Sequence, residues 1–302
     1  MSVTRLTRIG PEEGEGFEHE WVGGPVRCHM LSDVGKKRPH NEDSCMMSVP
    51  KYTSQVRPEP LLFAVADGMG GASAGERASR IALETLVDEL APNAGEAVPD
   101  ALRAAIQRAN RRVFEESASN AQYEGMGTTM SVVALCGDCA YVGQVGDSRA
   151  YLARPGSGLR QLTDDHSVVA EQVRKGLLTE EEARTHSLKN LITRAIGIKE
   201  QVEIDLFAVR VKRGDTLLIC SDGLSNMVGD TEIARVLGLR NLQGAARRLV
   251  GRALDEGGLD NITAVLVRII HTPPRAIIQE GAQQVTVPSG GLKGLFGVLL
   301  RR

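Results

Sequence analysis

The sequence LLFAVADGMGGASAG, residues 61–75, decides the fold of the chain around it. Residues 61–66 are apolar and uncharged, which is typical of a strand buried on both faces. Asp67 follows where this strand would leave the core, and three of the next four residues are glycines, which adopt positive φ and let the backbone approach a ligand closely. From residue 72 onward the sequence predicts a helix.

Two later stretches repeat this arrangement of an apolar run that ends in an acid. The run DTLLICSDGLSN contains Asp222 followed by glycine, and a weaker example, AYVGQVGDSRA, contains Asp147. Asp43 and Asp260 also lie at the edges of predicted strands. A single Asp-Gly pair is most often only a turn, so the recurrence of the pattern is what points to a shared site.

Carboxylates from several strand ends form one small site if those ends converge. Like charges that close cannot all remain ionised without a cation. A ligand set made only of oxygen favours a hard cation, Mg²⁺ or Mn²⁺, over zinc. Two such ions can activate a water molecule and neutralise a phosphoryl group.

The composition excludes several classes of protein. Of 302 residues, 42% are hydrophobic and 25% are charged, as in soluble globular proteins. The formal net charge of −2 gives no long-range attraction to nucleic acid. The N-terminal sequence lacks the apolar segment of a secretory signal, and no stretch is apolar for long enough to span a bilayer. We expect a monomer with no nucleic-acid partner and no membrane span.

The cysteines favour a reducing compartment. There are five of them, an odd and sparse set that suits free thiols in the cytoplasm better than a disulfide framework. Cys136 and Cys139 form a single CxxC sequence with no second pair nearby, which is a weak signal for zinc. Its expected place across a hairpin turn also argues against a thioredoxin-like motif.

Hydrophobic periodicity predicts ten strands and five helices. The strands are expected at residues 26–31, 44–49, 61–66, 128–136, 140–145, 149–153, 159–162, 202–209, 216–220 and 262–270. The helices are expected at residues 73–90, 100–118, 167–175, 230–237 and 241–256. Consecutive strands joined by tight turns imply antiparallel pairing, and the two long amphipathic helices predict a layer against a sheet.

The chain is predicted to hold one folded domain, at residues 26–270. Residues 1–25 are polar and glycine-rich, and we expect an extension with little regular structure. Residues 166–197 carry few large apolar side chains, which predicts an insert outside the main core. Residues 271–302 are expected to be a polar linker that ends in a short apolar and cationic segment.

Seven short motifs, in order, carry a family resemblance. They are SDVGKKRPHNED at 32–43, DGMGG at 67–71, GTT at 127–129, GDSR at 146–149, LTDDHS at 162–167, SDGL at 221–224 and DNIT at 260–263. With these motifs the chain resembles the bacterial PPM-type (protein phosphatase 2C-like) metal-dependent protein serine/threonine phosphatases. The resemblance implies an α+β fold, a four-layer αββα sandwich of two facing antiparallel sheets flanked by helices. The metal ions would lie at one end, between the sheets.

The resemblance implies a set of metal ligands. Asp67 would bridge two Mg²⁺ or Mn²⁺ ions, and the Gly68 carbonyl would be a further ligand. Asp43, Asp222 and Asp260 would complete the two sites. The water between the ions would attack phosphorus directly, without a phosphoenzyme.

The resemblance also implies roles around these ligands. Asp147 would hold a third, weaker ion together with Asp222, and Glu42 would act through metal-bound water. Arg38 would bind the substrate phosphate, because a guanidinium makes paired hydrogen bonds that a lysine cannot match. Arg38, Asp67 and Asp222 are therefore the predicted catalytic residues.

The sequence departs from the family pattern at one position. Many eukaryotic relatives place a general-acid histidine just after the Asp-Gly, where this chain has Met69, which cannot donate a proton. His40 is a possible substitute, although a solvated loop histidine is the commoner case. His166 is expected to be structural, so the general acid stays unassigned. Residues 166–197 match the variable flap that borders the active site in the family.

The predicted function is removal of phosphate from serine and threonine residues of proteins, opposing a bacterial Ser/Thr kinase. One alternative is a catalytically silent module that binds phosphoproteins and regulates them. A second alternative is a phosphatase that acts on small molecules. The complete set of acids favours catalysis over the silent module.

Overall fold

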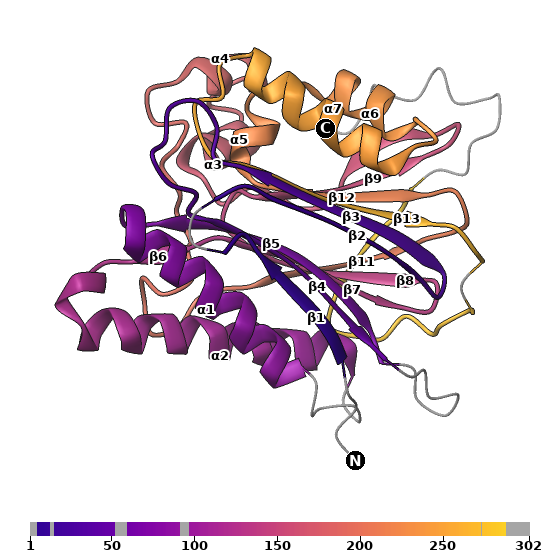
Figure 1. Ribbon diagram of the computed structural model, residues 1–302, viewed down its shortest axis with the longest axis horizontal. Helices are drawn as coiled ribbons and strands as arrows, with labels where there is room; N and C mark the ends of the chain where they lie inside the picture. The colour runs from indigo at the N-terminus through magenta and orange to yellow at the C-terminus, as the bar shows by residue number, and fades with distance from the viewer. Residues whose placement is uncertain (1–4, 13–14, 52–58, 91–96, 273, 288–302) are drawn as a thin grey trace.

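The computed structural model describes residues 5–12, 15–51, 59–90, 97–272 and 274–287. Two β-sheets face each other, and helices cover the outer face of each sheet (Figure 1). This arrangement is the four-layer αββα sandwich that the sequence predicts. The two helices predicted at residues 73–90 and 100–118 form one outer layer.

The first sheet has eight strands, in the order β1-β4-β5-β7-β8-β11-β14, with β6 paired to β5. Its strands are β1 (Arg5–Gly10), β4 (Asp43–Pro50), β5 (Leu61–Met69), β6 (Gly127–Thr128), β7 (Met130–Cys136), β8 (Cys139–Val145), β11 (Asp205–Arg210) and β14 (Gln283–Val285). All its pairs are antiparallel except that of β11 with β14, which is parallel.

The second sheet has six strands, in the order β10-β9-β12-β13-β3-β2, and all its pairs are antiparallel. Its strands are β2 (Phe17–Gly23), β3 (Val26–Asp33), β9 (Arg149–Arg154), β10 (Gly158–Gln161), β12 (Thr216–Cys220) and β13 (Ile262–Ile269).

The helices form the two outer layers and the flap. The long helices α1 (Ala72–Leu90) and α2 (Val98–Ser119) cover the first sheet. The short α5 (Asp222–Ser225), α6 (Asp230–Leu237) and α7 (Leu242–Asp255) cover the second sheet. The flap holds α3 (Val168–Arg174) and α4 (Glu180–Thr185), and a 3₁₀ turn, η1 (Ala121–Tyr123), follows α2. α4 begins with a capping box, in which the Thr179 side chain accepts from the Glu182 N–H and the Glu182 side chain accepts from the Thr179 N–H.

The core consists of three hydrophobic layers, and β5 shows why its sequence is apolar throughout. Leu62, Ala64 and Ala66 face α1 and α2, whereas Phe63 and Val65 face the second sheet. Successive side chains of a strand point to opposite faces, so a strand between two layers has no exposed face. Each large side chain buried in this way contributes about 1.5–3 kcal/mol to stability.

The expectation that residues 1–25 have little regular structure is wrong. β1 pairs with β4 in the first sheet, and β2 pairs with β3 in the second. Arg5 fixes β1 through hydrogen bonds to Ser48 and an ion pair with Glu59 of 2.9 Å. The N-terminal stretch therefore supplies an outer strand to each sheet.

The expectation of a polar linker at residues 271–302 is also wrong over its first part. Residues 274–287 run along the first sheet and end in β14 beside β11. Val285 and Val287 pack against the hydrophobic layer between the sheets. The apolar and cationic segment predicted at the end of the chain lies outside the described residues.

Candidate active site

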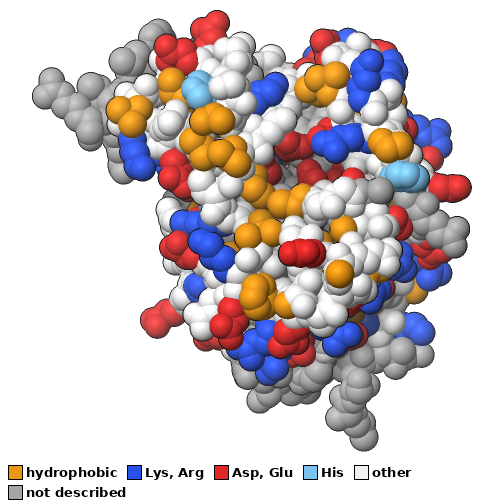
Figure 2. Space-filling view, turned by 90° about the vertical axis from the view of Figure 1, so that its left-hand side faces the viewer, with side chains coloured by type: hydrophobic (Ala, Val, Ile, Leu, Met, Phe, Trp, Pro, Cys, Tyr) orange, Lys and Arg blue, Asp and Glu red, His pale blue; other side chains and the backbone are white. Residues whose placement is uncertain are grey.

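The predicted acids converge at one end of the sandwich. Asp43 begins β4 and lies directly opposite Asp67, in β5, in the antiparallel ladder of the first sheet. Asp222 begins α5, one residue beyond the end of β12, and Asp260 precedes β13, so these two lie at strand ends of the second sheet. Asp147 lies in the turn between β8 and β9, where the chain crosses from one sheet to the other. Figure 2 shows acidic side chains inside a hollow on this face.

The carboxylates are close enough to repel one another. Burial, followed by the charges of Asp43, Asp222, Asp147 and Asp260, raises the pKa of Asp67 well above its usual value. Five carboxylates that repel one another in one buried site cannot all stay ionised at neutral pH.

Two neighbouring groups show the same effect. Burial, partly offset by hydrogen bonds from Thr263 and Ser221, raises the pKa of Asp43 to about 7. Burial and the charge of Asp260 raise the pKa of Asp222 to about 6. Protonation or a bound cation is therefore needed to relieve the repulsion among these acids.

The residues present fit a hard divalent cation. Their donors are all oxygen atoms, and one of them, Asp43 Oδ1, is buried without a hydrogen-bond partner among the described residues. Within the described ranges, however, no group of three or more acidic, histidine or cysteine side chains is already arranged to hold a metal ion. The carboxylates are therefore neighbours that do not form a closed ligand set.

Close backbone packing sets the position of Asp67. Its N–H donates to Thr129 Oγ1 at 3.0 Å, and its carbonyl accepts from Thr128 Oγ1 at 2.9 Å. At Gly68 a Cβ atom would lie 2.2 Å from the carbonyl oxygen of Gly75, at the start of α1. Only glycine fits this approach of strand to helix, which explains the Asp-Gly sequence.

The loop before β4 carries Arg38 and Glu42 to the same site. Arg38 Nη2 donates to Asp260 Oδ2 at 2.8 Å, although about half of its side chain is exposed (49%). Asn261 holds this loop in place, because its Oδ1 accepts from the Glu42 N–H and its Nδ2 donates to the carbonyls of Val34 and His40. Burial raises the pKa of Glu42. Arg38 is thus a cation at the edge of the acidic hollow.

His166 has a structural role, as the sequence predicts. Its Nδ1 accepts from the Gly146 N–H at 3.1 Å, so the neutral ring carries its proton on Nε2, which lies 3.0 Å from Asp205 Oδ2. The same contact with His166 lowers the pKa of Asp205. Arg194 also contacts Asp205, and this cluster joins both ends of the flap to the first sheet.

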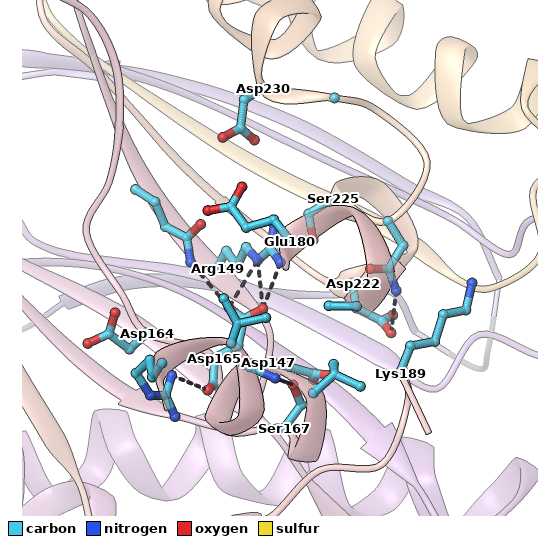
Figure 3. Close-up of a pocket in the computed structure, with 18 of the residues that line it drawn as sticks. Asp147, Arg149, Asp164, Asp165, Ser167, Glu180, Lys189, Asp222, Ser225 and Asp230 are labelled. Carbon is cyan, nitrogen blue, oxygen red and sulfur yellow. Dashed lines mark hydrogen bonds and ion pairs between the residues drawn. The ribbon is translucent and has the colours of Figure 1, made fainter. Parts of the chain in front are cut away.

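A cavity of about 450 Å³ connects the acids to the flap. Asp147 and Asp222 line one side of it, and residues of α3 and α4, including Glu180, line another (Figure 3). Arg149 makes paired hydrogen bonds to Asp165 at the cavity wall, with distances of 2.7–3.0 Å. The flap therefore borders the acidic site.

Sequence reasoning missed the polar groups that hold the acids in place. Ser221, Asn261 and Thr263 were recognised only as parts of motifs, yet each makes a hydrogen bond at the site. The one signal available was their position beside Asp222 and Asp260. Their partners depend on strand register, which local sequence does not reveal.

Comparisons with known proteins agree with this geometry. Residues 36–253 match the model of the Protein phosphatase 2C family. The serine/threonine phosphatase stp of Listeria welshimeri is 38% identical over 261 residues, covering 85% of this chain and 98% of that protein.

Solved structures show the same fold. The serine/threonine phosphatase of S. agalactiae superimposes with a TM-score of 0.74 at 37% identity, covering 81% of this chain and 99% of that one. The catalytic domain of the phosphatase PstP, solved in complex with two manganese ions, gives a TM-score of 0.69 at 34% identity, covering 81% and 98%.

These matches define the class of the protein. The chain belongs to the protein phosphatase 2C family, and it is an enzyme, a protein serine/threonine phosphatase, whose substrates are phosphorylated proteins. The family is metal-dependent. Within the part of the chain that the structure describes, no helix has the length and apolarity needed to cross a membrane.

Proposed function

We propose that this phosphatase uses two Mg²⁺ or Mn²⁺ ions held by Asp43, Asp67, Asp222 and Asp260. The observation that carries the proposal is the burial of these acids beside one another, which raises the pKa of Asp43 to about 7 and that of Asp222 to about 6. The Gly68 carbonyl is a further proposed ligand. The two manganese ions of the PstP complex support two sites of this kind.

Bound ions would supply an activated water molecule and neutralise the charge of the phosphoryl group during direct attack on phosphorus. The protein orients the phosphate: Arg38, at the edge of the hollow, has guanidinium N–H groups besides the Nη2 that contacts Asp260. Glu42 is half-buried beside the acids and would hold water at the site. Asp147, together with Asp222, would bind a third and weaker ion.

The identity of the general acid is left open in this mechanism. Met69 occupies the position after the first Asp-Gly and pairs with Gly127 between β5 and β6. A thioether has no proton to give. The exposed His40 lies two residues from Arg38, and its imidazole is one source of a proton for the leaving oxygen.

We further propose that the enzyme opposes a bacterial Ser/Thr kinase in the cytoplasm. All five cysteines are free, which suits a reducing compartment. None of the five predicted metal-binding aspartates is missing, so the silent phosphoprotein-binding module has no support in this chain.

Phosphate release from a phosphothreonine peptide tests the proposed chemistry. We expect release with Mn²⁺, none with EDTA, and a loss of roughly a hundredfold or more in Asp222→Ala, because a proposed ligand of the two-ion site, shared with the third ion, is removed. Circular dichroism would check that the variant is folded. A folded Asp222→Ala enzyme with full activity would eliminate the assigned site.

Arg38 can be tested separately from the metal ligands. Arg38→Lys keeps the charge but loses the paired geometry, and we expect KM to rise about 10-fold, with a larger rise for Arg38→Ala. Hydrolysis of small phosphomonoesters should be compared in the same assay. A preference for small esters over the phosphopeptide would favour the small-molecule alternative.

A further inference from the structure

Asp43 is held by groups that come from the opposite sheet. It begins β4 of the first sheet and is almost fully buried (1% exposed). Ser221, which follows β12 of the second sheet, donates from Oγ to Asp43 Oδ2 at 2.8 Å. The side chain of Thr263, in β13 of the second sheet, lies beside the Asp43 carboxylate and lowers its pKa. Two buried hydroxyls of the second sheet thus lie beside one carboxylate of the first, and that of Ser221 donates to it.

A network of polar side chains surrounds Thr263. The Asp43 N–H donates to Asn41 Oδ1, which orients the Asn41 amide so that its Nδ2 donates to Ser32 Oγ at 2.9 Å. Ser32 Oγ lies 2.7 Å from Thr263 Oγ1, and either hydroxyl can donate this hydrogen bond. These contacts join β3 and β13 beside the Asp43 carboxylate.

Ser221 is oriented by a backbone N–H of the neighbouring strand. Its Oγ accepts from the Thr263 N–H at 3.0 Å, which leaves the Ser221 hydroxyl proton for Asp43 Oδ2. The other oxygen, Asp43 Oδ1, is buried and has no hydrogen-bond partner among the described residues. A buried carboxylate oxygen without a partner is costly unless it binds something.

We propose that Ser221 and Thr263 are positioning residues that fix the Asp43 carboxylate so that Oδ1 is presented to a divalent cation. The inference rests on the proposed function, since it assumes that Asp43 is a metal ligand. Groups that hydrogen-bond a metal-binding carboxylate fix its rotamer before the ion arrives. Without them, Asp43 can turn away and the ion loses a preoriented oxygen.

Mn²⁺ binding measured by calorimetry tests this role without using activity. Ser221→Ala and Thr263→Val each remove one hydroxyl, and we expect each to weaken Mn²⁺ binding about 10- to 100-fold. Thr263→Ser keeps the hydroxyl and should stay within a few-fold of the unmodified enzyme. Because Thr263→Val keeps the shape of the side chain, it serves as the test if Ser221→Ala does not fold.

Ser48→Ala is the matched control. Ser48 is also fully buried in β4, but its hydroxyl contacts Arg5 and Thr7 at the other end of the strand. We expect Ser48→Ala to lower the thermal midpoint in EDTA without changing Mn²⁺ affinity. Ser221→Ala should weaken Mn²⁺ binding, even where its thermal midpoint in EDTA falls no further than that of Ser48→Ala.

The possible outcomes separate the inference from the proposed function. If the unmodified enzyme does not bind Mn²⁺, the metal mechanism fails and the inference fails with it. If it binds Mn²⁺ and Ser221→Ala and Thr263→Val bind equally well, the positioning role is refuted and the mechanism stands. The positioning role would also be refuted if Mn²⁺ affinity fell in proportion to the loss of thermal stability in every variant, Ser48→Ala included.

Discussion

At the scale of single residues, the two Asp-Gly sequences share one steric requirement. At Gly223 a Cβ atom would lie 2.0 Å from the carbonyl oxygen of Asn261, just as the one at Gly68 would meet Gly75. Neither Gly68 nor Gly223 has positive φ, whereas Gly70 and Gly71 do. The glycine after each acid is therefore needed for close backbone approach, and positive φ is needed only in the turn that follows the first pair.

Gly223→Ala adds only one methyl group, but we expect it to lower activity strongly. The added methyl group meets backbone, which cannot rotate away, so the start of α5 and with it Asp222 must shift. We expect kcat/KM to fall about 100-fold, because displacement by about 1 Å has that effect on positioned groups, and the free energy of unfolding to fall by about 1–3 kcal/mol. Phosphopeptide hydrolysis and urea denaturation measure the two effects.

Gly251→Ala provides the control for this substitution. Gly251 lies inside α7, where an added Cβ atom meets nothing within 4 Å. The alanine should raise the free energy of unfolding by about 0.5–1 kcal/mol and leave hydrolysis unchanged. Equal activity in Gly223→Ala and Gly251→Ala would show that the packing at Gly223 does not position Asp222.

At the scale of helices and strands, the sequence predicts interior elements and misses edges. β5 and β13 are apolar on both faces, so composition alone identifies them. β2 alternates half-buried and exposed residues and carries Glu18 and Glu20 on its exposed face, and β14 has only three residues. Such strands are stabilised by a distant partner strand, and no local signal distinguishes them from loops.

The same limit applies to the candidate site. Local sequence predicts the aspartates of the site, because each of them follows or precedes an apolar run. The hydrogen bonds of Ser221 and Thr263 depend on the pairing of β12, β13 and β3, which brings together residues far apart in the sequence. Local patterns predict which side chains lie at a strand end, and register decides which of them touch.

The stretch that follows β13 should contribute to stability and not to catalysis. Val285 packs against the layer between the sheets, while Ile277 in the same stretch is 88% exposed. We expect Val285→Asp to reduce the free energy of unfolding by about 1.5–3 kcal/mol and Ile277→Asp to change it by less than about 0.5 kcal/mol. Urea denaturation of both variants distinguishes a packed strand from a linker, for which the two changes would be equally mild.

At the scale of the whole molecule, the acids lie where the two sheets meet. Asp43 and Asp67 belong to the first sheet, and Asp222 and Asp260 to the strand ends of the second. Their repulsion therefore acts between the halves of the sandwich, and a cation bound among them would join the halves. Metal binding and global stability should consequently be coupled through the charge of this one cluster.

The coupling predicts an unusual pH dependence for the metal-free enzyme. The pKa of Asp222 in the folded protein is about 6 and that of Asp43 about 7, both above the usual value of 3.8. A carboxyl group whose pKa is higher in the folded chain binds more protons there, so its contribution to stability is present at low pH and is lost as pH rises through the folded pKa. In EDTA, the free energy of unfolding should therefore fall between pH 5 and pH 8.

Urea denaturation at pH 5, 6, 7 and 8 measures this fall, and two comparisons assign it to the cluster. Asp43→Asn removes one of the titrating groups, so the fall should be smaller in that variant than in the unmodified enzyme. Saturating Mn²⁺ should oppose the fall, because the ion binds the deprotonated carboxylates and stabilises the folded state most above pH 7. If Asp43→Asn and the unmodified enzyme keep the same pH dependence in EDTA, the acids do not share the charge that we assign to them.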